Sequence, residues 1–177
     1  MKKLILGSAI VAVLGVASNA MAAPNTGTVN FTGSVSTATC EIDLKDATGK
    51  IVSAVDLGTI GTNATAGSQV NFKLIPKDQT CLAKNAATMT WNSSTLKPTG
   101  ISNSVTTGTN AIMTLTASNA SDTDKIVKDG NTTFNYTVTR GGIASFDYIA
   151  QLVKPNATTA FTAGVFNASA NYSIAYK

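Results

Sequence analysis

The last fourteen residues of this 177-residue chain, GVFNASANYSIAYK, alternate apolar and polar side chains almost to the end. Such alternation is typical of a β-strand that buries one face. In this sequence no turn and no further strand follows the segment. An unpaired strand edge attracts another strand, so we expect a second neighbour from another molecule. The buried face of this strand would consist of Phe166, Ala168, Ala170, Tyr172, Ile174 and Tyr176.

Shorter alternating runs, separated by gaps rich in Gly, Asn, Ser and Thr, fill the rest of the chain. Strand-forming Thr and turn-forming Asn, Ser and Gly favour short antiparallel strands over helices. Residues 125–138 are interpreted as a hairpin around Asp129-Gly130-Asn131. A short helical turn is expected in 60–68 or in 77–85. The pattern predicts an all-β sandwich with strands at 27–35, 69–76, 87–91, 111–117 and 145–153.

The first 22 residues have the pattern of a secretory signal peptide. Lys2 and Lys3 precede an apolar run, and small residues follow up to Ala22. A transmembrane helix is the alternative, but the run is shorter than the roughly 20 apolar residues that a bilayer requires. Cleavage would leave 155 residues, enough for one domain, and lower the formal charge from +4 to +2. That weak charge gives no indication of nucleic-acid binding.

Cys40 and Cys81 are the two cysteines of the chain. Export to an oxidising compartment favours one intramolecular disulfide between them. It would close a loop of about 40 residues and stabilise the fold by about 3–4 kcal/mol in the chain-entropy view. A metal or redox pair is the alternative, but the two cysteines lack close CxxC spacing and the chain has no histidine.

The sequence offers little catalytic chemistry. The absence of histidine removes the usual general base and the commonest zinc ligand. Carboxylates that lie close in sequence, such as Asp43 and Asp46, are interpreted as solvated turn residues. Residues 122–131 resemble a calcium loop only superficially, because the glycine and glutamate of EF-hand spacing are missing. We therefore expect no enzyme activity, no cofactor and no metal site.

Several segments together resemble pilins of the chaperone-usher family. Gly164 is fourteenth from the C-terminus and Tyr176 is penultimate, and VDLG at 55–58 fits the same pattern. Within that family, four segments resemble the major subunits of thin, sialoglycolipid-binding fimbriae of enteric bacteria. They are TGTVNFTGSVSTATC (26–40), CLAKN (81–85), SFDYIAQL (145–152) and AGVF (163–166).

This resemblance implies an incomplete immunoglobulin-like antiparallel sandwich that lacks its seventh strand. Residues 23–35 would be an N-terminal donor extension and 36–177 the pilin domain. A periplasmic chaperone would first fill the groove beside the last strand, which begins near Gly164. At the outer-membrane usher the extension of the next subunit would replace the chaperone. The donor residues would be Val29, Phe31, Gly33 and Val35.

Two of these donor residues have a second interpretation. Gly33 in an ordinary strand would only weaken pairing, whereas in a donor strand it would allow close backbone approach. Phe31 could equally belong to the subunit's own core.

The function implied is that of a structural subunit of a surface fimbria. It would polymerise by donor-strand exchange, reach the cell surface through the periplasm and mediate attachment to host cells. The alternatives are a shaft subunit that carries its own glycan site and a minor fimbrial subunit. Arg140 and Lys154 are candidates for contact with sialylated glycans, because cations pair with the carboxylate of sialic acid.

Overall fold

A computed structural model describes the backbone of residues 27–33 and the whole of residues 40–177. The predicted signal peptide, residues 23–26 and Val35 lie outside these described residues.

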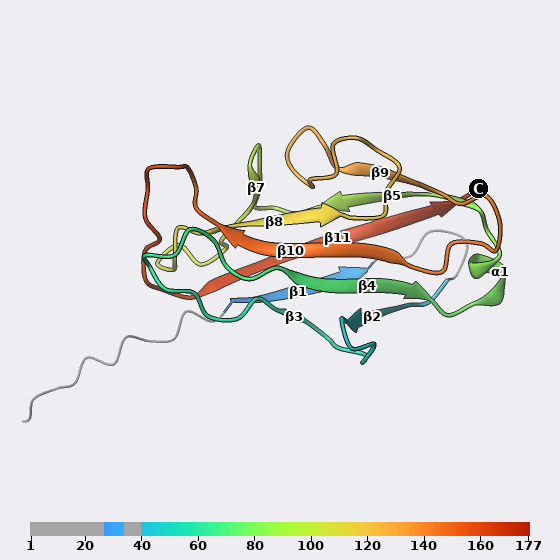
Figure 1. Cartoon of the computed structure of the whole chain (residues 1–177), viewed down its shortest axis with the longest axis horizontal. Helices are drawn as coiled ribbons and strands as arrows, with labels where there is room; N and C mark the ends of the chain where they lie inside the picture. Colours follow the sequence, from blue (N-terminus) through green and yellow to red (C-terminus); the bar gives the residue numbers. More distant parts are fainter. Residues whose placement is uncertain (1–26, 34–39) are drawn as a thin grey trace, which may run out of the picture.

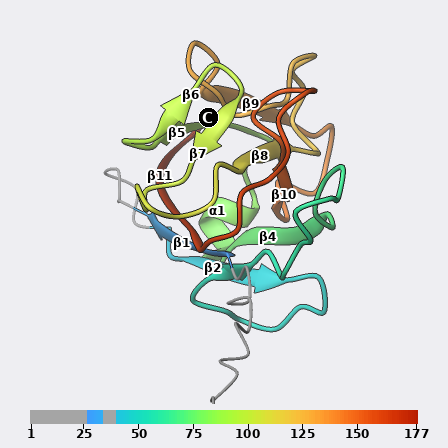
Figure 2. The ribbon, with the colours of Figure 1, turned by 90° about the vertical axis from the view of Figure 1, so that its left-hand side faces the viewer.

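The described residues form eleven strands and one short helix, arranged as two sheets (Figure 1). Seen end-on, β5, β11 and β1 form one layer, and β8, β10 and β4 form the other (Figure 2). The sheets are antiparallel except for the pair β1 and β11. The predicted all-β sandwich is therefore confirmed.

The first sheet has the order β3 (Val55–Asp56), β1 (Gly27–Gly33), β11 (Phe166–Tyr176), β5 (Ala86–Asn92), β9 (Thr133–Thr137). The second has the order β2 (Ile42–Asp46), β4 (Val70–Pro76), β10 (Phe146–Val153), β8 (Ile112–Ala117), β7 (Gly100–Ser102), β6 (Leu96–Lys97). Helix α1 (Gln79–Leu82) lies in the second region where a helical turn was expected. No helix among the described residues is long and apolar enough to cross a membrane.

The predicted hairpin at 125–138 is wrong in one arm. Gly130 has a φ of 80°, and Lys128 bridges to Asn131, so the turn itself is present. However, the N–H of Val127 donates to the carbonyl of Leu115 in β8, at 2.8 Å. The segment before the turn thus joins the second sheet, and β9 after it joins the first. In this position the side chain of Val127 is completely buried. Pairing with β9 would instead have placed the segment at the edge of the first sheet.

Strand β2 was not predicted. Its inward residues, Ile42 and Leu44, alternate with Asp43 and Lys45, and two apolar residues among charges are a weak signal. The strand forms because β4 provides a partner over the register from Ile42–Pro76 to Asp46–Phe72.

The centre of the sandwich contains a buried hydrogen-bonded group. The indole N–H of Trp91 donates to the hydroxyl of Tyr148 at 2.8 Å, and that hydroxyl donates to the sulfur of Met89 at 2.9 Å. The hydroxyl of Tyr136 lies 2.5 Å from that of Tyr148 and therefore donates to it, because Tyr148 has a single hydroxyl proton. Burial raises the pKa of both tyrosines above the usual range. The group joins β5 and β9 to β10 across the two sheets.

We predict that Tyr148→Phe lowers the free energy of unfolding by about 1–3 kcal/mol, because the buried N–H of Trp91 and the hydroxyl of Tyr136 lose their common partner. Urea denaturation followed by tryptophan fluorescence measures the change. Tyr172→Phe is the matched control, because the structure gives the half-buried Tyr172 hydroxyl no hydrogen bond within the described residues. Equal effects of the two substitutions would contradict the prediction.

Candidate strand-pairing site

The last strand, β11, has a neighbour from the same chain on each side. Residues Asn171–Tyr176 pair antiparallel with β5. On the other side β1 runs parallel to β11, from Gly27 opposite Phe166 to Gly33 opposite Tyr172. The sequence predicted a neighbour from another molecule on this side, whereas here the chain's own segment lies there. The physical reason is that residues 27–33 carry the alternating pattern that this position accepts, so they can pair within the chain.

Strand β1 covers seven of the eleven residues of β11. Along the covered part, Phe166, Ala168 and Ala170 are only 1–3% exposed. From Tyr172 onward the inward side chains are half-buried. Within the described residues, Ser173–Tyr176 pair with β5 alone. The inward side chains of the last strand are therefore fully buried in its first part and only half-buried in its second part.

Two tyrosines dominate the less covered part of β11. The ring of Tyr172 lies 5.4 Å from that of Trp91, and the ring of Tyr176 lies 6.2 Å from that of Phe146. Burial, with smaller contributions from Tyr172 and the carboxylate of Asp78, raises the pKa of Tyr176 to about 12. Its hydroxyl oxygen is buried without a hydrogen-bond partner in the described part of the chain. This end of β11 thus combines aromatic surface with an unsatisfied polar group.

The start of β11 depends on Gly164 and Asn103. Gly164 has a φ of 147°, and a Cβ atom there would lie 2.7 Å from the backbone N of Thr109. The Asn103 amide donates to the carbonyl of Val165 at 2.7 Å and accepts from the N–H of Asn167 at 2.9 Å. Sequence reasoning identified Gly164 but missed Asn103, because nothing distinguishes it from the many other loop asparagines.

A disulfide and several polar contacts anchor the chain where the N-terminal segment joins the sandwich. Cys40 and Cys81 form the predicted disulfide, with a Cα–Cα distance of 6.2 Å. The N–H of Glu41 donates to the carboxylate of Asp78 at 3.2 Å. Lys77 pairs with Glu41 at 2.9 Å, and this hydrogen bond is the main cause of the raised pKa of Lys77. Residues from Cys40 onward are therefore held to α1 independently of β1.

The structure does not bring the two candidate receptor cations together. Arg140 is exposed in the loop before β10, whereas Lys154 directly follows β10. Lys154 is half-buried in the wall of an open hollow of about 390 Å³, together with Thr65, Val153 and Asn156. Of the two cations, Lys154 thus lines a concave surface.

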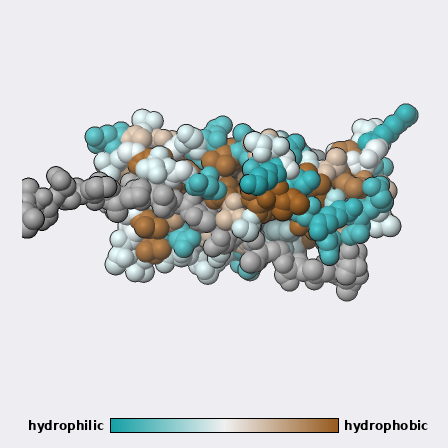
Figure 3. All heavy atoms as spheres, turned by 90° about the horizontal axis from the view of Figure 1, so that it is seen from below, coloured by the Kyte–Doolittle hydropathy of each residue, from teal (hydrophilic) through white to brown (hydrophobic). Residues whose placement is uncertain are grey.

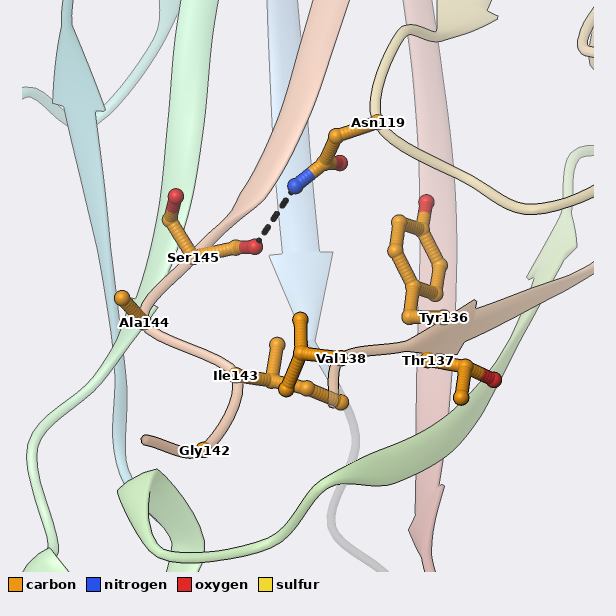
Figure 4. Close-up of a pocket in the computed structure, with 8 residues that line it drawn as sticks. All are labelled: Asn119, Tyr136, Thr137, Val138, Gly142, Ile143, Ala144 and Ser145. Atoms are coloured by element: carbon orange, nitrogen blue, oxygen red, sulfur yellow. Dashed lines mark hydrogen bonds between the residues drawn. The ribbon is translucent and has the colours of Figure 1, made fainter. Parts of the chain in front are cut away.

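A second hollow, of about 190 Å³, lies beside the end of β9 (Figure 4). The side chains of Asn119, Tyr136 and Ser145 in its lining are hydrogen-bonded within the protein. Asn119 donates to the carbonyl of Ser145 at 3.0 Å and accepts from the N–H of Asp147 at 2.8 Å. Among the residues that the structure describes, no group of His, Cys, Asp and Glu could hold a metal ion.

The surface seen from below carries apolar side chains in its middle, with polar side chains around them (Figure 3). Over the described residues, the exposed large hydrophobic side chains are Ile51, at 61%, and Val165, at 45%. Val165 lies next to the start of β11, between Gly164 and Phe166.

These features describe a β-sandwich whose distinctive site is a strand-pairing surface formed by the two ends of the chain. No protein-family model matches the sequence. The chain is, however, 36% identical to the K99 fimbrial protein of Escherichia coli over 186 aligned positions, which cover 99% of both chains. The chain belongs to the fimbrial proteins, which are structural components of surface fimbriae and not enzymes. The predicted resemblance to a fimbrial subunit is confirmed.

We predict that Gly164→Ala destabilises the start of β11. Alanine is strained at a φ of 147°, and its Cβ would collide with the backbone at Thr109. The expected loss in the free energy of unfolding is about 1–3 kcal/mol, measured by urea denaturation. Gly130→Ala is the control, because Gly130 has a φ of 80° but nothing within 4 Å of an added Cβ. An equal loss in both variants would show that crowding at Gly164 has no effect.

Proposed function

We propose that this chain is the structural subunit of a surface fimbria that polymerises by donor-strand exchange and mediates attachment to host cells. In the fibre, residues 23–35 of one subunit would lie beside β11 of the next, with Val29, Phe31, Gly33 and Val35 toward its groove. Without this strand the immunoglobulin-like sandwich would be incomplete. The membership of the chain in the fimbrial proteins supports a polymeric role.

The observation that carries the proposal is the pairing of β1 with β11. A seven-residue register between the two strands supports the view that the backbone of this segment fits the place beside the last strand. A copy of the segment from a neighbouring subunit has the same sequence and hence the same ability to pair.

Two features favour replacement of the internal pairing by an intermolecular one. The internal pair is parallel, and parallel pairs are slightly less stable per residue than antiparallel ones. Within the described residues the pair reaches Tyr172, and beyond it the inward side chains of Ile174 and Tyr176 are half-buried. A donor strand that extends over all of β11 would cover this surface as well.

The energies are large enough for a durable fibre. Three or four apolar side chains, at about 1.5–3 kcal/mol each, together with ladder hydrogen bonds, give a gross stabilisation on the order of 10 kcal/mol. The net stability of a whole domain is only about 5–15 kcal/mol. The pairing at β11 is therefore comparable in gross size with the net stability of a domain, and exchange would transfer this pairing from within one molecule to between two.

The partners in this proposal are identical or related pilin subunits, a periplasmic chaperone and an outer-membrane usher. Strand addition to an exposed sheet edge is a known mode of chaperone and pilin association. The less covered Tyr172–Tyr176 part of β11 is where a chaperone strand would add most contact. Whether the chain is a major or a minor subunit is decided by antibody labelling of fibres, since a major subunit labels the whole shaft.

We predict that a variant lacking residues 23–35 forms no fibres but accepts the missing strand in trans. A synthetic peptide of residues 23–35 should raise the melting temperature of this variant by several degrees. It should have a much smaller effect on the full chain, where β1 already lies beside β11. Scanning fluorimetry measures the shift, and negative-stain microscopy detects fibres.

The control peptide carries Phe31→Asp, which places a charge where an apolar side chain is expected to be buried. Normal fibres from the deletion variant, or equal shifts with both peptides, would overturn the donor assignment.

A second candidate function is a glycan-binding site on the same subunit, and the hollow at Lys154 favours it. Lys154, Thr65 and Asn156 line the same hollow, so a cation and hydrogen-bonding side chains share one concave surface. A sialylated glycan offers a carboxylate and hydroxyl groups of matching chemistry.

We predict that Lys154→Ala weakens the binding of sialyllactose by about tenfold, the loss expected for one charge-assisted hydrogen bond. Calorimetry on the purified protein measures the affinity, with uncharged lactose as the reference ligand. Arg140→Ala removes an exposed cation outside the hollow and should leave binding unchanged. If Arg140→Ala has the larger effect, the hollow at Lys154 is not the site.

A further inference from the structure

The sandwich has four edge strands in its described part, and each is a place where a foreign strand could add. They are β3 and β9 in the first sheet and β2 and β6 in the second. Exposed edges promote association between chains, and natural proteins shorten or cover them. Strands β3 and β6 have two residues each, too few for a stable ladder. The two longer edge strands, of five residues each, are β2 and β9.

The outer edge of β2 is covered by the chain itself. After Asp46 the backbone turns back, and the N–H of Val52 donates to the carbonyl of Leu44 at 3.0 Å. The N–H of Asp46 donates to the carbonyl of Lys50, also at 3.0 Å. These bonds occupy outward groups in the second half of β2, the Leu44 carbonyl and the Asp46 N–H, so a new strand could not pair along the whole edge.

Strand β9 is a five-residue edge without a neighbouring strand on its outer side in the described part of the protein. The bonds that flank the strand show which residues face inward. The N–H of Val138 donates to the carbonyl of Asn85, and the carbonyl of Thr132 accepts from Trp91. Even-numbered residues thus point their backbone groups toward β5. Those of Thr133, Asn135 and Thr137 point outward, because backbone groups alternate along a strand.

The central outward residue, Asn135, has both backbone groups occupied. Its N–H donates to a carboxylate oxygen of Asp122 at 2.6 Å, and its carbonyl accepts from the N–H of Ser121 at 2.7 Å. The Asn135 side-chain amide donates to the second carboxylate oxygen of Asp122 at 3.1 Å. The half-buried Asp122 therefore binds one residue at two points, in the middle of the edge.

We infer that Asp122 is a specificity-determining residue for assembly, because it blocks β9 against strand addition from a second copy of this chain. A new strand at β9 would have to break the two bonds from Asp122 and the bond from Ser121. This inference deepens the proposed function, since strand addition is then directed to β11 and subunits join end to end and not side by side.

The experiment compares Asp122→Ala, Asp122→Asn and Asp129→Ala with the wild-type chain. Asp122→Ala should form side-by-side aggregates, with a severalfold faster rise in light scattering and bundled material in negative stain. Asp122→Asn retains a side-chain carbonyl that can accept from the Asn135 N–H, so it should behave as the wild type. Asp129→Ala removes the same charge from an exposed turn residue whose side chain makes no hydrogen bond within the described residues.

Two readouts separate this inference from the proposed function. Scattering by purified monomer reports lateral pairing at β9, whereas heat-sensitive ladders on unheated gels report end-to-end exchange. The inference is overturned if Asp122→Ala matches the wild type in scattering. It is also overturned if Asp122→Asn aggregates as fast as Asp122→Ala, since charge and not the hydrogen bond would then protect the edge. Loss of ladders in the wild type would instead contradict donor-strand exchange.

Discussion

The pairing of β11 with the strand beside it is the interaction on which the rest of this protein depends. Strand β11 is the longest strand described and provides core residues from Phe166 to Ala170. On the side where β1 lies, the backbone N–H and C=O groups of β11 need a strand partner. The chain provides that partner over seven residues. In the proposed fibre the same ladder would form between two molecules, so that one interaction would complete the fold and also join subunits.

The other parts of the molecule keep this pairing in one place. The Cys40–Cys81 disulfide and the polar contacts around Lys77 hold the body of the chain to α1, so β1 can leave β11 without loss of the anchor. The hydrogen-bonded group around Tyr148 joins the two sheets from within. In the proposed assembly, the other sheet edges are short, covered by the chain itself or bound by a carboxylate, and strand addition is directed to β11. An assembly that grows in one direction requires this combination.

Strands that alternate buried and less buried residues are readable from the sequence of this protein. Alternation located β4, β5, β8, β10 and β11, because each buries alternate residues more deeply than the residues between them. It missed β2, where two apolar residues stand among charges, and it misplaced residues 125–128, whose partner β8 is chosen by packing. At the candidate site, Gly164 and the inward residues of β11 were identified from pattern. Asn103 and Asp122 were not, because their roles depend on backbone groups that lie far away in sequence.

The sequence by itself determined the all-β class, the buried faces of the main strands, the disulfide partners and the resemblance to fimbrial subunits. These are properties of residue type and local order, which period-two alternation and cysteine number express directly. Only the tertiary structure decided that residues 27–33 lie parallel to β11, that Lys154 lines a hollow and that Asp122 binds the edge of β9. Each of these depends on which distant segments become neighbours, and that is determined by the packing of the whole sandwich.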